Sequence, residues 1–211
     1  MYWTERRERF RALLAGDRCV HPGSVYDAVT KTLLARRNVP EWRVVRAYPT
    51  EPGYIQAVAR GIRAKLGDDL GGRHLVISLH GIPMRYDTEG DPYAGHCCAT
   101  ACAIAAELQL PGDRFTLAFQ SQFGREQWLG PPVDQVLKKL AAQGKDVAVA
   151  CPGFTADCLE TIDEVGREYA HVFREAGGGE YTFVPCINTD GGWMDTMADL
   201  VRRESHGWLT P

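Results

Sequence analysis

Residues 75–83 read LVISLHGIP, and this stretch decides the fold class. The apolar run from Leu75 to Leu79 is short enough to be a buried strand. The Gly-Ile-Pro that follows cannot continue a regular element, so we expect the strand to stop there. His80 therefore stands at the carboxyl end of a strand, where open α/β sheets build their sites. Histidine also moves protons near neutral pH, which makes this position a candidate for chemistry.

Strand and helix patterns alternate along the rest of the chain. The expected strands are residues 42–47, 74–79, 115–120, 146–151 and 181–186, and the expected helices are residues 24–37, 51–66, 96–108, 133–142, 157–176 and 194–204. Such alternation implies a parallel sheet with right-handed crossovers. We therefore expect an α/β fold of the Rossmann type, a three-layer sandwich in which a parallel sheet of four or more strands carries helices on both faces.

Composition and charge exclude several classes of protein. The 211 residues are enough for one good core, and 45% apolar with 24% charged residues is typical of a soluble globular protein. A net charge of -3 argues against a nucleic-acid surface, and no apolar run approaches the length of a membrane span. The first eleven residues lack the apolar core of a secretory signal, so we expect a cytoplasmic protein. Peripheral contact with a membrane stays open.

The seven cysteines do not form a disulfide framework, because their number is odd and they are scattered. Cys98 and Cys102 are four residues apart and would share a helix face beside Cys97. With Cys151 or Cys158 they would provide the ligands of a metal or iron–sulfur site. The alternative is that they are small side chains that fill a helix–sheet interface. We favour the alternative, since no paired CxxC spacing occurs.

Several further motifs follow His80 in a fixed order. They are HGIPM at residues 80–84, GDPY at 90–93, FQSQFG at 119–124 with WL at 128–129, and CPGFTADCLET at 151–161. Together they resemble the ferrochelatase family, whose members insert ferrous iron into a porphyrin. The resemblance covers most of the chain, from about Gly23 to about Val201. It implies a chelatase-like α/β fold and a lyase of haem biosynthesis that converts protoporphyrin IX to protohaem.

The resemblance assigns the chemistry to a histidine and to carboxylates. Two pyrrole N–H protons must leave as the metal ion enters, so the site needs a proton acceptor. His80 is expected to be that acceptor and a transient iron ligand, with Glu160 as its catalytic partner and Glu164 as a further metal ligand. Ferrous iron is the substrate, and no cofactor is expected. The chain has no cysteine after Cys186, so the iron–sulfur cluster of some family members is not expected either.

The carboxylates are spaced as on one helix face. Glu160, Glu164 and Glu168 are four residues apart, and Asp157 extends the stripe towards the helix start. From spacing alone, a solvated helix face is the simpler interpretation, and acidic residues also favour a helix N-terminus. In the family, such a stripe leads away from the metal site and is thought to conduct protons or iron. The resemblance therefore favours function for Glu160 and supporting roles for Asp157 and Glu168.

A rigid apolar slot must hold the macrocycle. The residues expected to bind it are Pro83, Met84, Gln120, Ser121 and Trp128. The indole of Trp128 offers a large flat face, although tryptophans are also frequent core anchors.

Two further residues are expected to support the loop after His80 rather than to take part in the reaction. Asp91 and Tyr93 are suited to fix this loop by hydrogen bonding. Gln122 departs from the family, which usually has Arg or Lys there. The missing cation would have bound a propionate or formed a structural ion pair.

The resemblance thins before residue 40. Ferrochelatases have two similar α/β domains with the porphyrin cleft between them, and almost all of the first is absent upstream of Gly23. We expect a remnant of an N-terminal chelatase domain at residues 1–40, a C-terminal chelatase domain at 41–205 and a tail at 206–211. The expected partners are porphyrin, ferrous iron, and either the missing domain or a second copy of the chain.

Two alternatives to a complete ferrochelatase stay open. One is a truncated, non-catalytic remnant that binds metal or tetrapyrrole. The other is a single-domain chelatase that completes its cleft as a homodimer, as some cobalt chelatases do.

Overall fold

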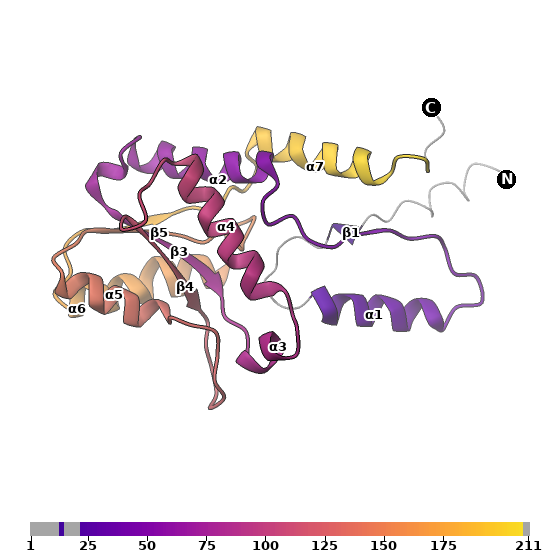
Figure 1. Cartoon of the computed structure of the whole chain (residues 1–211), viewed down its shortest axis with the longest axis horizontal. Coiled ribbons are helices and arrows are strands. Elements are labelled where there is room, and N and C mark those ends of the chain that lie inside the picture. Colours follow the sequence, from indigo (N-terminus) through magenta and orange to yellow (C-terminus); the bar gives the residue numbers. More distant parts are fainter. Residues whose placement is uncertain (1–12, 15–21, 209–211) are drawn as a thin grey trace.

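A computed structural model describes residues 13–14 and 22–208 (Figure 1). Residues 1–12 and 15–21 of the expected N-terminal remnant, and residues 209–211 of the expected tail, lie outside the described residues. The centre of the molecule is a four-stranded sheet in the order β4-β3-β5-β6, and each neighbouring pair is parallel. Its strands are β3 (His74–His80), β4 (Phe115–Gln120), β5 (Val147–Ala150) and β6 (Tyr181–Val184).

Helices cover both faces of this sheet, which confirms the α/β sandwich predicted from the alternation (Figure 1). One face carries α2 (Pro52–Leu66), α4 (Tyr93–Glu107) and α7 (Gly191–Glu204). The other carries α5 (Val133–Ala142), a π-helix η2 (Glu160–Glu168) and α6 (Tyr169–Glu175). Short helices also occur at η1 (Leu70–Gly72) and α3 (Met84–Thr88).

Burial on both faces fixes the position of β3. Leu75 and Ile77 are fully buried in the apolar cluster under α2 and α4. Val76, which points the opposite way, is fully buried in the cluster under α5 and α6. A strand that is apolar on both sides is typical of a central parallel strand. His80, the last residue of β3, is therefore placed by a strand that is buried on both faces.

Among the helices whose bounds differ from the sequence prediction, two carry residues of the expected site. The helix expected over residues 157–176 is a π-helix from Glu160 to Glu168 that continues as α6. The helix expected from residue 96 begins three residues earlier, at Tyr93, whose backbone N–H is accepted by the Asp91 carboxylate at 2.9 Å. Both differences lie next to the expected site.

The N-terminal part contains a second, two-stranded sheet. Here β1 (Leu13–Leu14) pairs in parallel with β2 (Val44–Val45), and α1 (Pro22–Leu34) lies between them in the sequence. The strand expected at 42–47 is thus shorter than predicted. The division of the chain near residue 40 stays a prediction. None of the helices in the described part is long and apolar enough to cross a membrane.

Candidate active site

His80 is held at the carboxyl edge of the sheet by both its ring and its backbone. Its Nδ1 lies 2.7 Å from the carbonyl oxygen of Gly81, and the Tyr93 hydroxyl donates to the His80 carbonyl at 2.9 Å. A carbonyl oxygen only accepts, so this contact places the ring proton on Nδ1. Nε2 of the neutral ring is then the atom that can take up a further proton. The half-buried imidazole has the geometry of a positioned base.

The loop after His80 is joined by backbone hydrogen bonds to the segment that carries Trp128. Pro83 and Trp128 form an antiparallel bridge, Met84 N–H donates to Gln127 O at 2.8 Å, and Leu129 N–H donates to Ile82 O at 2.9 Å. Pro83 is buried, whereas Met84 and Trp128 are half-buried. Three of the residues expected to bind substrate therefore lie together beside the end of β3.

Phe123 is a second aromatic residue beside Trp128 that the sequence reasoning missed. The Trp128 indole N–H donates to the Phe123 carbonyl at 2.9 Å, and the two ring centroids are 4.8 Å apart. The Phe123 side chain is 72% exposed, which is unusual for so large an apolar group. Its place in the FQSQFG motif was visible, but nothing in the sequence indicated that it would be exposed.

Gly81 allows this close approach of the two segments. A Cβ at this position would lie 3.0 Å from the backbone oxygen of Gln120 and 3.2 Å from Cε3 of Trp128. Neither neighbour is the flexible end of a side chain, so any larger residue would push the His80 loop away from Trp128.

We expect Gly81→Ala to lower the free energy of unfolding by about 1–3 kcal/mol, because the added methyl overpacks a tight contact. Urea denaturation of the two proteins measures the difference. Gly95→Ala in α4 is the matched control, since no atom lies within 4 Å of its added methyl. That control should be stabilised by roughly 0.5–1 kcal/mol, as expected for Gly replaced by Ala within a helix. Equal responses from the two variants would show that the contact at Gly81 is loose.

Gln120 lies beneath the edge rather than on it. It pairs in register with His80 but is fully buried, and its Oε1 accepts the Ser78 hydroxyl at 2.6 Å. Its Nε2 is buried and has no hydrogen-bond partner among the described residues. The thiol of Cys151 lies 3.5 Å from Oε1 of Gln120. Burial raises the pKa of this thiol well above the usual value. A direct contact between Gln120 and substrate would require the edge to open.

The three glutamates of the expected carboxylate stripe lie in two different environments. Glu160, the first residue of η2, and Glu168, the last, are exposed. Glu164 is half-buried and accepts hydrogen bonds from the Ser121 backbone N–H at 2.8 Å, the Ser121 hydroxyl at 2.6 Å and the Tyr169 hydroxyl at 2.8 Å. Because Ser121 follows the register partner of His80, this contact brings η2 to the same sheet edge as His80.

Asp157 ties together the loops that follow β5 and β6. Its carboxylate accepts the Cys186 backbone N–H at 3.0 Å and the Asn188 amide at 2.8 Å. Burial alone would raise the pKa of Asp157, but these hydrogen bonds hold it below the ordinary value. Asp157 therefore stays ionised near neutral pH and holds the start of the segment that leads into η2.

Gln122 stands where the family usually has Arg or Lys, and it forms a hydrogen bond to the backbone rather than an ion pair. Its amide Nε2 donates to the Leu129 carbonyl at 2.8 Å and so braces the loop that carries Trp128. The neutral side chain at this position thus has a structural partner.

The cysteines of α4 do not share one environment. Cys97 is buried, as expected of an interface residue, whereas Cys98 and Cys102 are exposed, and for these two the prediction of interface packing was wrong. They lie on the outer face of a helix whose inner face packs on the sheet. Among the residues that the structure describes, no group of three or more His, Cys, Asp and Glu side chains is arranged to hold a metal ion. His80, Glu160 and Glu164 are thus not a preassembled three-ligand site.

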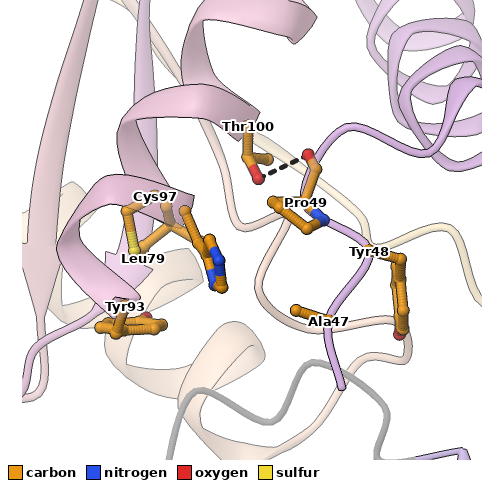
Figure 2. Close-up of a pocket in the computed structure, with 8 residues that line it drawn as sticks. Ala47, Tyr48, Pro49, Leu79, Tyr93, Cys97 and Thr100 are labelled. Carbon is orange, nitrogen blue, oxygen red and sulfur yellow. Dashed lines mark hydrogen bonds between the residues drawn. The ribbon is translucent and has the colours of Figure 1, made fainter. Parts of the chain in front are cut away.

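A small cavity lies on the α4 side of the end of β3 (Figure 2). Figure 2 shows Leu79 and Tyr93 at one side of it and the segment 47–49 at the other, where the Thr100 hydroxyl donates to the Pro49 carbonyl at 2.8 Å. His96 also lines this cavity. The cavity of about 20 Å³ holds roughly one water molecule, so it is a packing gap behind His80 rather than a substrate pocket.

Comparison with known proteins agrees with the motifs. The model of the family described as Ferrochelatase matches residues 18–205. The chain is 40% identical over 189 residues to the ferrochelatase of Marinobacter nauticus, covering 89% of this chain and 51% of that protein. It is 41% identical over 182 residues to the ferrochelatase of Aeromonas hydrophila, covering 86% of this chain and 56% of that protein. The chain thus spans about half the length of the curated relatives it matches.

Solved structures are also similar in fold. One of them is described as SirB from Bacillus subtilis with Fe3+, and it matches with a TM-score of 0.61 over 93% of this chain and 70% of that chain. The sequence identity of 13% restricts this likeness to the fold.

Proposed function

The chain belongs to the ferrochelatase family, and on this premise we propose that it carries the catalytic half of a porphyrin chelatase of haem synthesis. In the proposed reaction, ferrous iron enters a porphyrin while two pyrrole N–H protons leave. His80 takes up a proton at Nε2, and Glu160 accepts protons from His80 or receives the ion. Both iron and porphyrin are substrates.

The observation that carries this proposal is the arrangement around the end of β3. A histidine with its Nδ1 engaged, and therefore with Nε2 available as a base, lies beside the half-buried Trp128 and Met84. A proton acceptor next to an apolar wall is what metal insertion requires, because the macrocycle must be held while its protons are removed. The proposal that Glu160 supplies a carboxylate for the divalent ion is supported by the contact of Glu164, in the same π-helix, with Ser121 at this edge.

We expect the purified chain to insert Zn²⁺, a stable substitute for Fe²⁺, into protoporphyrin. Loss of free-porphyrin absorbance and growth of zinc-porphyrin fluorescence measure the reaction. The same assay with coproporphyrin identifies the preferred macrocycle. If the folded chain, present in excess, metallates neither porphyrin faster than buffer alone, this result contradicts catalysis by the chain.

The length of the chain favours one second candidate. The chain spans about half the length of the relatives it matches, so we propose as the second candidate a protein that provides the His80 side of the site alone. A protein of this kind binds tetrapyrrole or metal without turnover. Quenching of tryptophan fluorescence by porphyrin in the absence of insertion would support this candidate over the enzyme.

A further inference from the structure

Glu164 differs from the glutamates at either end of η2. Glu160 and Glu168 are exposed, but the Glu164 carboxylate is half-buried and both of its oxygens are engaged. Oε1 accepts the Ser121 N–H and the Tyr169 hydroxyl, and Oε2 accepts the Ser121 hydroxyl. The donors come from two separate elements, the turn after β4 and the start of α6. The Glu164 side chain therefore joins η2 to the turn after β4 and to the start of α6.

The Tyr169 contact coincides with the π-helical register. The backbone N–H of Tyr169 donates to the Glu164 carbonyl five residues earlier, which is the pattern of a π-helix. The Tyr169 hydroxyl donates to the side chain of the same residue. In an α-helix, residues five apart point about 140° away from each other, so this side-chain contact favours the π register over the α register. Burial, followed by the bond to Glu164, raises the pKa of Tyr169, so its hydroxyl remains a donor.

Ser121 anchors the other side of the carboxylate. Its φ of 60° is in the left-handed region, which costs free energy for a residue other than glycine. In this conformation its N–H and its hydroxyl both reach Glu164. Ser121 directly follows Gln120, the register partner of His80. The strained turn therefore connects η2 to the strand ends that carry the base.

We propose that Glu164 is a positioning residue that, with Ser121 and Tyr169, holds residues 160–168 in the π register and so fixes the Glu160 carboxylate relative to His80. A return to the α register would rotate Glu160 about the helix axis relative to Tyr169. With three donors on its two oxygens, Glu164 is also poorly placed to bind an ion, and it belongs to no metal-binding group among the described residues. The effect on catalysis rests on the proposed function, whereas the control of helix register does not.

The role of Glu164 in the π-helical register of residues 160–168 is tested without any measurement of metal insertion. Tyr169→Phe keeps the ring and removes the donor, and we expect amide hydrogen exchange in residues 160–168 to become at least about tenfold faster. Tyr181→Phe is the matched control, because the hydroxyl of Tyr181 donates to the Val165 carbonyl in the same helix without touching Glu164. Both variants should lower the melting temperature by roughly 2–4 °C, but Tyr181→Phe should leave the exchange of this segment unchanged. Equal exchange in the two variants would overturn the proposal.

The effect of this register on metal insertion is tested by measuring kcat and KM separately. We expect Tyr169→Phe, Ser121→Ala and Glu164→Gln to lower kcat for zinc insertion by about 10- to 100-fold and to leave KM for Zn²⁺ unchanged, because the base and its partner are misplaced rather than lost. If Glu164→Gln instead raises KM for Zn²⁺ while Tyr169→Phe does not, Glu164 is a metal ligand and the proposal fails. If the wild-type chain inserts no metal, the proposed function fails, and the exchange result still decides the role of Glu164 in the register.

Discussion

Replacing His80 by Ala is expected to reduce metal insertion by at least about 100-fold while the chain stays folded. The imidazole is the candidate base, and a positioned general base contributes typically 10²–10⁴-fold. Its removal should be tolerated by the fold, because the ring is half-buried and its one hydrogen bond is to the carbonyl of the next residue. Zinc insertion measures the rate, and thermal unfolding measures the stability.

His171→Ala provides a control for the loss of a histidine. The His171 side chain is 67% exposed and lies next to Glu175 on α6, so its removal should leave both rate and stability near those of the wild type. Retained turnover in His80→Ala would exclude His80 as the proton acceptor. Unfolding of His80→Ala would show that the Tyr93 and Gly81 contacts depend on the imidazole, and that the residue is structural.

The position of His80 was predictable because the sequence signals around it are local. An apolar run of strand length followed by Gly-Ile-Pro defines a strand end, and the alternation of elements places that end at the carboxyl edge of a parallel sheet. Burial on both faces of β3 then agrees with the continuous apolar run. The sheet order β4-β3-β5-β6 was not predictable in this way, since it depends on which crossover packs against which face.

The arrangement of the carboxylates was not predictable from spacing. Glutamates four residues apart are consistent with one face of an α-helix, and nothing in the sequence distinguishes that helix from a π-helix. One of the contacts that set Glu164 apart joins it to Ser121, 43 residues away, in another element of the fold. The sequence therefore predicted one stripe of similar glutamates, whereas Glu164 is hydrogen-bonded between two elements and Glu160 and Glu168 are exposed.

Local signals also misjudged polar residues at the strand ends. Gln120 looks like an edge residue in the sequence because it ends an apolar run, yet it is fully buried beside Ser78. The segment at residues 131–132 pairs with the neighbouring Phe119, and the Gln120 side chain lies against Ser78 and Cys151. Such contacts are a long-range property that no motif encodes.

Addition of the complementary half of a relative is expected to increase insertion by at least about 100-fold. The chain spans about half of the Marinobacter nauticus ferrochelatase, and of the residues proposed to hold the macrocycle, Trp128 and Met84 are half-buried, with Phe123 72% exposed beside Trp128. An open slot neither excludes water nor holds the macrocycle in one geometry, and loss of positioning alone can cost about 100-fold. Exposed apolar groups of this kind also mark a surface that a partner covers.

The added component is the part of the Marinobacter nauticus protein that this chain does not match. Zinc insertion is measured as the concentration of this part is increased. Saturation of the rate, together with a complex in sedimentation, is the expected result. The same addition to His80→Ala is the control, because it should form the complex and yet stay inactive if the base belongs to this chain. A monodisperse monomer that turns over at the saturated rate without any addition would show that one wall is sufficient. In that case the enclosure would have to come from the exposed Phe123 and the half-buried Trp128 closing on the bound macrocycle.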